Sequence, residues 1–350
     1  MKKKIAICAA QIPFNYGGAE ILVEELNRQL NKRGFQSEII YVPFKWYPKS
    51  QLIENALVWK MLDLTESNGE KIDLVICTKY PTYAVKHPNK ITWLFHQHRP
   101  IYDLLDTSYT DFDKSNIEDL KYIKQIKKID ELTLKESKKI FTISKNVSER
   151  LKKFNDIDSE VVYPPTQLEG RYYTEKYDDY ILSAGRLDPL KRIELMIEAM
   201  KYVKSNVRFL IAGRGKHEKI LKEVVKKNGL ENRVEFLGFV KEEELLNLYA
   251  NAGAIYFAPK DEDYGFITIE AFKSKKTVIT TNDSGGVLEF VKDHKTGLIS
   301  NPNAKEIALN VDKLFQDKRQ LEILGQEAFE KVVNINWDFV VDKLVNDFLK

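Results

Sequence analysis

Short apolar runs alternate along the chain with segments in which apolar residues recur every three or four positions. The first run, Ile5–Ala9, is too short for a signal peptide and predicts a buried β-strand. A turn signal at 15–18 follows, and residues 19–33 show helical spacing before Gly34, which suits the end of a helix. This alternation predicts parallel strands with helices on both faces of the sheet.

The strand-like runs fall into two series. Two prolines in Val161–Pro165 restrict the backbone, so we predict a domain boundary after residue 164. In such doubly wound sheets ligands bind at the carboxyl ends of the strands, and a cleft between the domains is the expected site. The predicted strands are 39–42, 74–77, 92–95 and 140–143 in the first series, and 180–184, 207–212, 234–237, 254–258 and 277–280 in the second. Predicted helices include 216–227, 242–251 and the stretch from 305 onward.

Composition narrows the class of protein. The 350 residues carry a formal net charge of +3, which does not indicate a dedicated nucleic-acid binder. Two cysteines, Cys8 and Cys77, without a CxxC pair exclude a disulfide framework and a cysteine-based zinc site, and they favour a reducing compartment. No apolar run approaches the ~18 residues of a membrane span.

The segment 258–271 carries the densest set of candidate ligand-binding residues. An apolar strand leads into an acidic loop, and a helix is predicted to begin near Gly265 or Phe266. A helix start offers N–H groups and partial positive charge for a phosphate. Glu262 in the loop and Glu270 in the helix could both accept hydrogen bonds from sugar hydroxyls. The alternative, that acidic residues only complement the helix start, stays open on this segment alone.

The segment 183–192 places two cations at the end of a predicted strand. Arg186 follows a glycine, and a turn brings Lys191 next to the following helix. Two fixed cations at the carboxyl end of a strand could neutralise a diphosphate leaving group. A solvated cluster of basic residues is the competing interpretation in a chain this rich in lysine.

Two further segments carry weaker signals. Gly17 and Gly18, between the first strand and helix, could form a phosphate or acceptor loop or a plain tight turn, but they lack the dinucleotide fingerprint. His96 and His98 form a His-x-His pair without a completing carboxylate, so contact of His96 with a ligand, or a structural role, is favoured over a metal site.

An acidic and a basic region each suggest an additional ligand. Asp261 and Asp263 spell an Asp-x-Asp motif, which can hold Mg²⁺ with a nucleotide, and we interpret this match as a coincidence. Lysines along 121–153 lie beside isoleucines at helical spacing. This pattern suits an ordinary solvated helix, and contact with anionic lipid is the alternative.

Taken together and in this order, these segments resemble retaining glycosyltransferases of family 4. The resemblance covers essentially the whole chain and is strongest over 181–298, where it is also carried by 209–213, 236–238, 284–287 and 296–298. It implies an α/β GT-B fold with two Rossmann-like parallel-sheet domains facing a cleft. Residues 1–164 would be the acceptor-binding domain and 165–334 the donor-binding domain, and a C-terminal helix at about 335–350 would cross back to the first domain.

The resemblance also implies roles for the candidate residues. Arg186 and Lys191 would hold the donor diphosphate, Glu262 the transferred sugar and Glu270 the ribose. His96 would contact the sugar near the reacting carbon. The remaining implied contacts are the backbone of Gly265, Phe266 and Ile267 at the phosphates, Phe239 and Val240 near the base, and Gly17 and Gly18 on the acceptor side.

Some positions depart from the family pattern. Arg192 stands where a glycine usually follows the lysine, and Asp263-Tyr264 replaces the commoner Gly-Phe. Lys275 and Thr277 replace a usual glycine and proline. None of these changes removes an implied contact.

The resemblance implies transfer of a hexosyl group from a UDP- or GDP-linked sugar, with retained configuration, to a glycan, a lipid-linked glycan or another hydroxyl acceptor of cell-surface polysaccharide or glycoconjugate synthesis. No metal or other cofactor is expected, and a cytoplasmic location, peripheral to the inner face of the membrane, would suit this activity. Alternatives are a nucleotide-sugar epimerase of the same fold and a non-catalytic partner protein with a degenerate donor site. A nicotinamide oxidoreductase is disfavoured by the missing glycine fingerprint.

Overall fold

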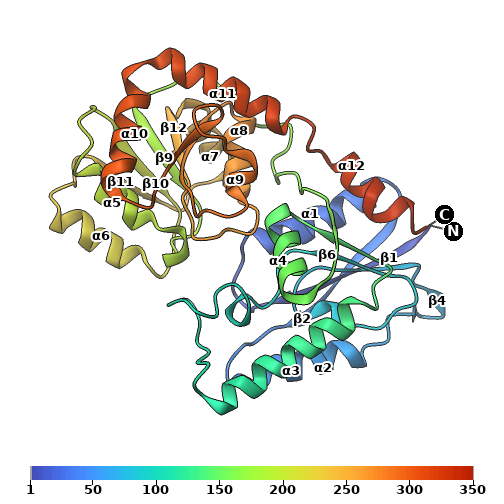
Figure 1. Cartoon of the computed structure of the whole chain (residues 1–350). Coiled ribbons are helices and arrows are strands. Elements are labelled where there is room, and N and C mark those ends of the chain that lie inside the picture. Colours follow the sequence, from blue (N-terminus) through green and yellow to red (C-terminus); the bar gives the residue numbers. More distant parts are fainter. Residues whose placement is uncertain (1, 350) are drawn as a thin grey trace. The chain divides into compact units, whose positions relative to one another are not determined.

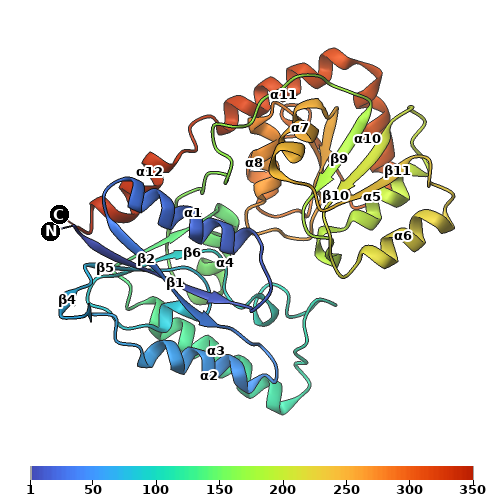
Figure 2. The same ribbon diagram turned by 180° about the vertical axis from the view of Figure 1, so that it is seen from behind.

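The computed structural model describes residues 2–349, and Met1 and Lys350 lie outside the described part. The chain divides into two compact units, seen from opposite sides in Figures 1 and 2. Unit 1 comprises Met1–Gln167 and Asn336–Lys350, and unit 2 comprises Leu168–Ile335. The sequence analysis placed the two boundaries after residues 164 and 334.

Unit 1 is built on a six-stranded sheet with the order β2-β1-β5-β6-β7-β8, and every neighbouring pair is parallel. A small antiparallel hairpin, β3–β4, precedes β5. The strands are β1 (Lys4–Gln11), β2 (Gln36–Pro43), β3 (Glu66–Ser67), β4 (Glu70–Lys71), β5 (Leu74–Cys77), β6 (Lys90–Leu94), β7 (Lys139–Thr142) and β8 (Glu160–Val161).

Helices cover both faces of this sheet. In both views α2 and α3 lie side by side on one face, and α1 lies on the other (Figures 1 and 2). The helices are α1 (Gly18–Lys32), α2 (Ser50–Met61), α3 (Ile117–Leu134) and α4 (Lys145–Asn155), with short 3₁₀ turns at Thr82–Ala84 and Arg99–Ile101.

Helix α2 was not predicted from the sequence. Its inner face buries Leu52, Ala56 and Trp59, while Leu57 and Met61 on its outer face are 51% and 84% exposed. Apolar residues on two faces blur the helical periodicity that reveals an amphipathic helix.

The C-terminal segment groups with unit 1, where the sequence analysis expected a helix at about 335–350. Helix α12 (Trp337–Val341) begins where the side chain of Asn336 accepts the N–H of Phe339, and it continues as a π-helix at Asp342–Asn346. The segment is tied to the sheet by Lys343 Nζ, 2.6 Å from Glu160 Oε1.

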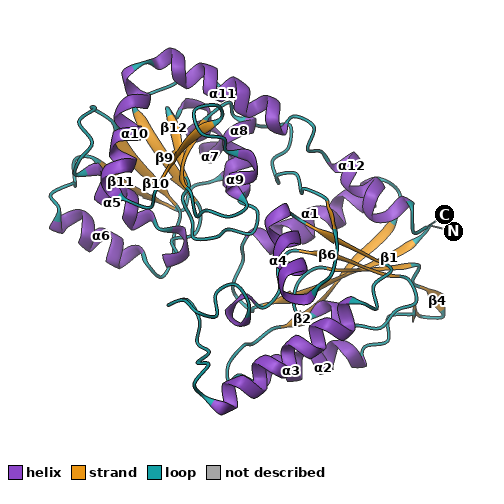
Figure 3. Ribbon diagram, viewed as in Figure 1, coloured by secondary structure: helices purple, strands orange, loops and turns teal. Residues whose placement is uncertain are grey.

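Unit 2 repeats the architecture with a second six-stranded parallel sheet, ordered β11-β10-β9-β12-β13-β14 (Figure 3). Its strands are β9 (Tyr180–Ala184), β10 (Arg208–Ala212), β11 (Val234–Gly238), β12 (Ala254–Tyr256), β13 (Thr277–Thr281) and β14 (Gly297–Ser300). Its helices are α5 (Ile193–Met200), α6 (Glu218–Lys227), α7 (Glu242–Asn251), α8 (Phe266–Lys273), α9 (Val287–Phe290), α10 (Ala304–Gln316) and α11 (Lys318–Val332), with a 3₁₀ turn at Pro189–Lys191.

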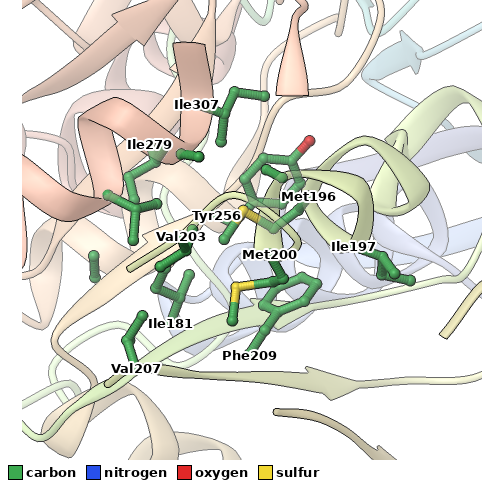
Figure 4. Close-up of a cluster of buried hydrophobic side chains, with 14 of the residues drawn as sticks. Ile181, Met196, Ile197, Met200, Val203, Val207, Phe209, Tyr256, Ile279 and Ile307 are labelled. Carbon is green, nitrogen blue, oxygen red and sulfur yellow. The ribbon is translucent and has the colours of Figure 1, made fainter. Parts of the chain in front are cut away.

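The core of unit 2 lies between the sheet and the helices α5, α6 and α10. Figure 4 shows Met196 and Met200 of α5 packed with Phe209 of β10, Tyr256 of β12 and Ile279 of β13. All five side chains are at most 1% exposed. This apolar layer holds the strand ends in place, and truncating one of its large side chains typically costs about 3–5 kcal/mol.

Strand order reverses once in each sheet, and the reversal locates the candidate sites. In unit 1 it falls between β1 and β5, and in unit 2 between β9 and β12. Loops at the carboxyl ends of the two flanking strands diverge there and leave room for a ligand. The loops that follow β9 and β12 contain 185–192 and 257–265, the two segments that the sequence analysis singled out.

Candidate functional site

The switch point of unit 2 brings together Lys191 and Glu262. Lys191 ends the 3₁₀ turn after β9, and its Nζ lies 2.6 Å from Oε2 of Glu262 in the loop after β12. Their side chains are 24% and 20% exposed. Lys191 Nζ also lies 5.3 Å from the centroid of the Phe257 ring. A cation and a carboxylate thus meet at the sheet edge, half-buried and open to a ligand.

Backbone hydrogen bonds fix the loop that carries Glu262. Its N–H donates to the carbonyl of Ser284 at 3.2 Å, and its carbonyl accepts the N–H of Gly286 at 2.8 Å. Gly286 is required there because a Cβ atom would come within 2.5 Å of the carbonyl of Asp263. The Ser284–Gly286 turn noted in the sequence therefore holds the acidic loop in place through backbone hydrogen bonds.

Helix α8 begins directly after this loop, as predicted. Its N-cap, Gly265, has φ +88°, a left-handed conformation that favours glycine. Phe266 and Ile267 occupy the first turn, and the Phe266 ring packs edge-on against Tyr264 at 5.1 Å. The Ile267 side chain lies over Gly185, since a Cβ atom at Gly185 would be 3.2 Å from its Cδ1 atom. The glycine after β9 thus meets the start of α8.

Glu270 lies one turn further along α8 and is held by a residue that the sequence analysis missed. Tyr249 of α7 donates its hydroxyl to Glu270 Oε2 at 2.8 Å. Burial raises the pKa of Glu270, and the hydrogen bond from Tyr249 only partly offsets this effect. Tyr249 is fully buried, and no sequence spacing connects it with Glu270.

The remaining residues of unit 2 lie nearer the surface. Arg186 is exposed in the loop after β9. Val240 lies between β11 and α7, next to Phe239, which is 73% exposed. The roles proposed for these side chains stay predictions.

Arg192 was noted in the sequence only as a departure from the family pattern, and the structure gives it extensive contacts. Its backbone is left-handed, with φ 50°, and its guanidinium hydrogen-bonds both oxygens of Asp283 at 2.7 and 2.9 Å. The same group donates to the carbonyls of Ala258 and Pro259 at 2.8 Å. Ala258 is the last residue of the predicted strand 254–258, whereas β12 ends earlier, at Tyr256.

The predicted residues of unit 1 lie at the carboxyl edge of its own sheet. Gly17 and Gly18 start α1 after β1, and the Gly17 N–H donates to Glu20 Oε2 at 3.0 Å. His96 follows β6, and its Nδ1 lies 2.7 Å from the Gln97 carbonyl. Because a carbonyl can only accept, Nδ1 carries the proton in this contact.

An ion pair that the sequence analysis did not consider flanks the switch point of unit 1. Lys79 follows β5, and its Nζ lies 3.0 Å from Oε1 of Glu20 in the first turn of α1. Both side chains are about 15% exposed, at 15% and 14%. Only the Gly-Gly signal at 17–18 pointed toward this place in the sequence.

The structure offers no clear metal centre among residues 2–349, since no cluster of three or more His, Cys, Asp or Glu side chains is placed to hold an ion. His98 is half-buried, and its ring centroid lies 5.8 Å from that of Tyr80 and 6.2 Å from that of Phe112, which accounts for it structurally. Burial, together with the nearby His96, lowers the pKa of His98 to about 3. None of the described helices is both long and apolar enough to cross a bilayer.

Known structures show the same fold over the whole chain. Sucrose-phosphate synthase from Thermosynechococcus elongatus superimposes with a TM-score of 0.80 at 18% sequence identity, and the match covers 99% of this chain and 98% of that one. WaaG, a glycosyltransferase involved in lipopolysaccharide biosynthesis, matches with a TM-score of 0.71. The class of fold is therefore GT-B.

Sequence comparisons point to the same class. The family described as glycosyl transferases group 1 matches residues 171–331, which lie within unit 2. Alpha-1,3/1,6-mannosyltransferase ALG2 of Dictyostelium discoideum is 31% identical over 45% of this chain and 42% of its own length. O-antigen chain mannosyltransferase RfbU of Salmonella typhimurium is 28% identical over 69% of this chain and 62% of its own length.

The chain thus spans less than half the length of the curated relatives that are 31% identical to it, which are matched over 43% and 42% of their own length. Fold and sequence together nevertheless agree with the family resemblance on which the sequence analysis settled. Residues 171–331 match the family of glycosyl transferases group 1, and the fold of the chain is GT-B, as the resemblance to family 4 implied.

Proposed function

We propose that the protein transfers a hexosyl group from a UDP- or GDP-linked sugar to a hydroxyl acceptor, with retention of the anomeric configuration. The observation that carries this proposal is the Lys191–Glu262 pair, 2.6 Å apart at the switch point of the sheet in unit 2. A diphosphate and a sugar need a cation and a carboxylate side by side. Glu270, one turn into α8, supplies a second carboxylate for the ribose.

In the proposed mechanism Lys191 and Arg186 stabilise the departing diphosphate, and the start of α8 adds N–H groups at Phe266 and Ile267. Glu262 exchanges its contact with Lys191 for the hydroxyls of the sugar when the donor binds. The acceptor hydroxyl attacks the anomeric carbon from the face that the diphosphate leaves, and the leaving phosphate takes its proton. His96 would contact the sugar near the reacting carbon, and the side of unit 1 that carries Gly17 and Gly18 would hold the acceptor.

The acceptor that we propose is a glycan or a lipid-linked glycan of surface polysaccharide or glycoconjugate synthesis. Two curated relatives named as mannosyltransferases, ALG2 and the O-antigen chain enzyme RfbU, support a glycan product. Solved structures of the same fold contain UDP and glucose, which supports a nucleotide-sugar donor. A nucleotide-linked sugar is then the co-substrate, and no further cofactor is proposed.

A weak contact with an anionic membrane surface is part of the proposal and would place the enzyme in the cytoplasm at the inner face of the membrane. Lys121, Lys124 and Lys128 are exposed on α3, and Leu57 and Met61 are exposed on the neighbouring α2. Cosedimentation with phosphatidylglycerol vesicles should exceed that with phosphatidylcholine vesicles, and Lys124→Glu/Lys128→Glu should remove the difference. Equal sedimentation with both vesicles would refute the contact.

The test of the function begins with calorimetric titration of UDP, GDP and their sugars. Binding of one nucleoside diphosphate and of its sugar nucleotide is expected, followed by transfer to an isolated glycan acceptor with the α-configuration of the donor retained in the product. Activity should persist in EDTA, because Lys191 supplies a fixed positive charge beside the Glu262 carboxylate. Absence of nucleotide binding would overturn the proposal in favour of a non-catalytic partner protein.

A nucleotide-sugar epimerase of the same fold remains the alternative enzyme. It would convert the sugar nucleotide without any acceptor, whereas a transferase leaves the sugar configuration of its donor unchanged. Incubating the donor alone and analysing the sugar by NMR separates the two. Epimerised nucleotide sugar in the absence of acceptor would replace the proposed function.

A further inference from the structure

Arg192 occupies a position where the backbone itself favours glycine. Its φ of 50° lies in the left-handed region, where a side chain is crowded against its own backbone. A large residue at such a place needs compensation from its contacts. The residue directly follows Lys191, whose own turn is held locally, since the Asp188 carbonyl accepts the N–H of Lys191 at 2.9 Å.

The guanidinium of Arg192 joins three segments that are distant in sequence. Five hydrogen bonds of 2.7–2.9 Å connect it to the carbonyls of Ala258 and Pro259, the hydroxyl of Thr281 and the carboxylate of Asp283. The backbone carbonyl of Arg192 in turn accepts the hydroxyl of Tyr256 at 2.9 Å. Planar, bidentate pairing of this kind is specific to arginine and fixes geometry as well as charge.

Asp283 links Arg192 to the loop that carries Glu262. Its carboxylate also accepts Lys260 Nζ at 3.1 Å, and its backbone carbonyl accepts the N–H of Asp261 at 2.9 Å. The next residue, Ser284, accepts the N–H of Glu262. Burial acts to raise the pKa of Asp283, but hydrogen bonds from Arg192, Lys260 and Thr281 outweigh it and hold that pKa well below its usual range. The carboxylate is therefore ionised at neutral pH.

We infer that Arg192 is a positioning residue of the donor site: its guanidinium, locked onto Asp283, sets where the loop of Glu262 stands relative to Lys191, and so governs how strongly the sugar half of the donor is held. The inference rests on the proposed function, because it assigns a support to the pair that would bind the sugar. It concerns the sugar half only, since Glu270 is held separately by Tyr249.

The test compares the affinity for a nucleoside diphosphate with the affinity for its sugar nucleotide, by calorimetry, and adds kcat of transfer. Arg192→Gly removes the guanidinium while easing the left-handed backbone, so the variant is expected to fold. The affinity for the sugar nucleotide and kcat should each fall ~10-fold, as for loss of charge-assisted hydrogen bonds. The affinity for the nucleoside diphosphate should stay within ~2-fold of the wild type.

Three further variants sharpen the test. Asp283→Asn should reproduce the phenotype of Arg192→Gly, and the double variant should be no worse than either single one, because both remove the same pair. Arg192→Lys should recover part of the loss, since lysine keeps the charge without the bidentate geometry. Arg208→Ala, which breaks an exposed pair with Glu235 in the same sheet, should behave as the wild type.

Failure of the inference differs from failure of the proposed function. If the wild type binds nucleotide and transfers sugar while Arg192→Gly keeps the same ratio of affinities and the same kcat, Arg192 has no positioning role. A lowered Tm with unchanged ratio and kcat would assign it to stability alone and also overturn the inference. If the wild type itself binds no nucleoside diphosphate, the proposed function falls and takes the inference with it.

Discussion

The two units place a lysine–glutamate pair at the same point of the same kind of sheet, but they secure the pair in different ways. In unit 1 the pair is Lys79 and Glu20, 3.0 Å apart, and in unit 2 it is Lys191 and Glu262, 2.6 Å apart. Glu20 is part of a helix start and caps Gly17 with its second oxygen. Glu262 lies in a loop and depends on neighbouring strands for its position.

Glu20 has a local support, from residues close to it in sequence, whereas Glu262 has a distributed support, from residues far from it in sequence. Glu20 sits three residues from the group that it caps, so the helix itself places it. The loop of Glu262 is placed by Arg192 and Asp283, which lie 91 positions apart. The family match covers 171–331 and thus falls in the unit with the distributed support. We take unit 2, with its distributed support, to be the donor side, because several of its residues must contact one ligand at the same time.

The largest effect should follow from removing the cation of unit 2. Lys191→Ala is expected to lower kcat about 10²–10³-fold, because it deletes a preorganised charge at the departing diphosphate. Far-UV circular dichroism and the Tm should stay close to the wild type, since the side chain is 24% exposed. The measurement is steady-state transfer with saturating acceptor.

A matched control for Lys191 exists on α6. Lys222 forms a pair with Glu218 at the same 2.6 Å, but on an exposed helix face. Lys222→Ala should leave kcat unchanged within ~2-fold. Equal activity losses in the two variants would contradict the difference between the switch-point pair and a surface pair.

The next effect is the pH dependence of stability, and its sign differs between a carboxylate of unit 1 and one of unit 2. Burial raises the pKa of Asp130 in unit 1 to about 7, although the hydroxyls of Tyr83 and Tyr102 at 2.8 and 2.7 Å act to lower it. The folded state therefore holds a proton that the unfolded state releases above pH ~4. This contribution to stability is present at low pH and is lost as pH rises through about 7. Asp283 of unit 2, whose pKa is lowered, loses its contribution only as pH falls.

The substitution Asp130→Asn removes the titrating carboxylate, and so isolates its contribution to the free energy of unfolding. Between pH 5 and pH 7 the free energy of unfolding of the wild type should fall by ~2 kcal/mol relative to the variant. Urea unfolding, followed by fluorescence at several pH values, measures the difference between the two slopes. Parallel pH profiles would show that Asp130 titrates normally, whatever constant offset the substitution introduces.

The sequence predicted local helices and strands better than contacts between distant segments of the chain. Strand β9 and helix α7 lie where predicted, because β9 is a short run buried throughout and α7 has one buried face. The start of α8 and the position of Glu262 followed from Gly265 and the acidic loop. Helix α2 was missed because it carries apolar residues on two faces.

The supports of the site could not be predicted in the same way. Arg192 contacts Asp283, and Tyr249 contacts Glu270, across elements whose adjacency exists only once the sheet is assembled. Their spacing along the chain has no period to detect. The family pattern marked Arg192 only as an exception, and its contacts emerged from the strand order.

A smaller effect is expected on the acceptor side. Lys79 lies at the switch point of unit 1, and an ammonium group has three donors, so it can hold Glu20 and a further oxygen together. Lys79→Met should raise KM for the acceptor ~10-fold and leave KM for the donor unchanged, as for loss of one charged hydrogen bond. Lys139→Met is the control, because Lys139 lies at the start of β7, at the amino-terminal ends of the strands. It should change neither constant. A change in donor KM alone would reverse the assignment of the two sides.

The smallest effect tests a side-chain support of the proposed donor site outside the Arg192 cluster. Tyr249→Phe removes the hydroxyl that holds Glu270 Oε2 at 2.8 Å and keeps the buried ring. Because burial already raises the pKa of Glu270, loss of this hydrogen bond should raise it further and weaken its grip on the ribose. KM for the donor should rise ~3-fold, equivalent to about 0.5–1 kcal/mol, with kcat unchanged. Tyr180→Phe is the matched control, since its hydroxyl donates to the Leu248 carbonyl at 2.7 Å rather than to a ligand-binding group. A drop in kcat at constant KM would instead tie Tyr249 to the sugar half of the donor, and so to the same support as Arg192.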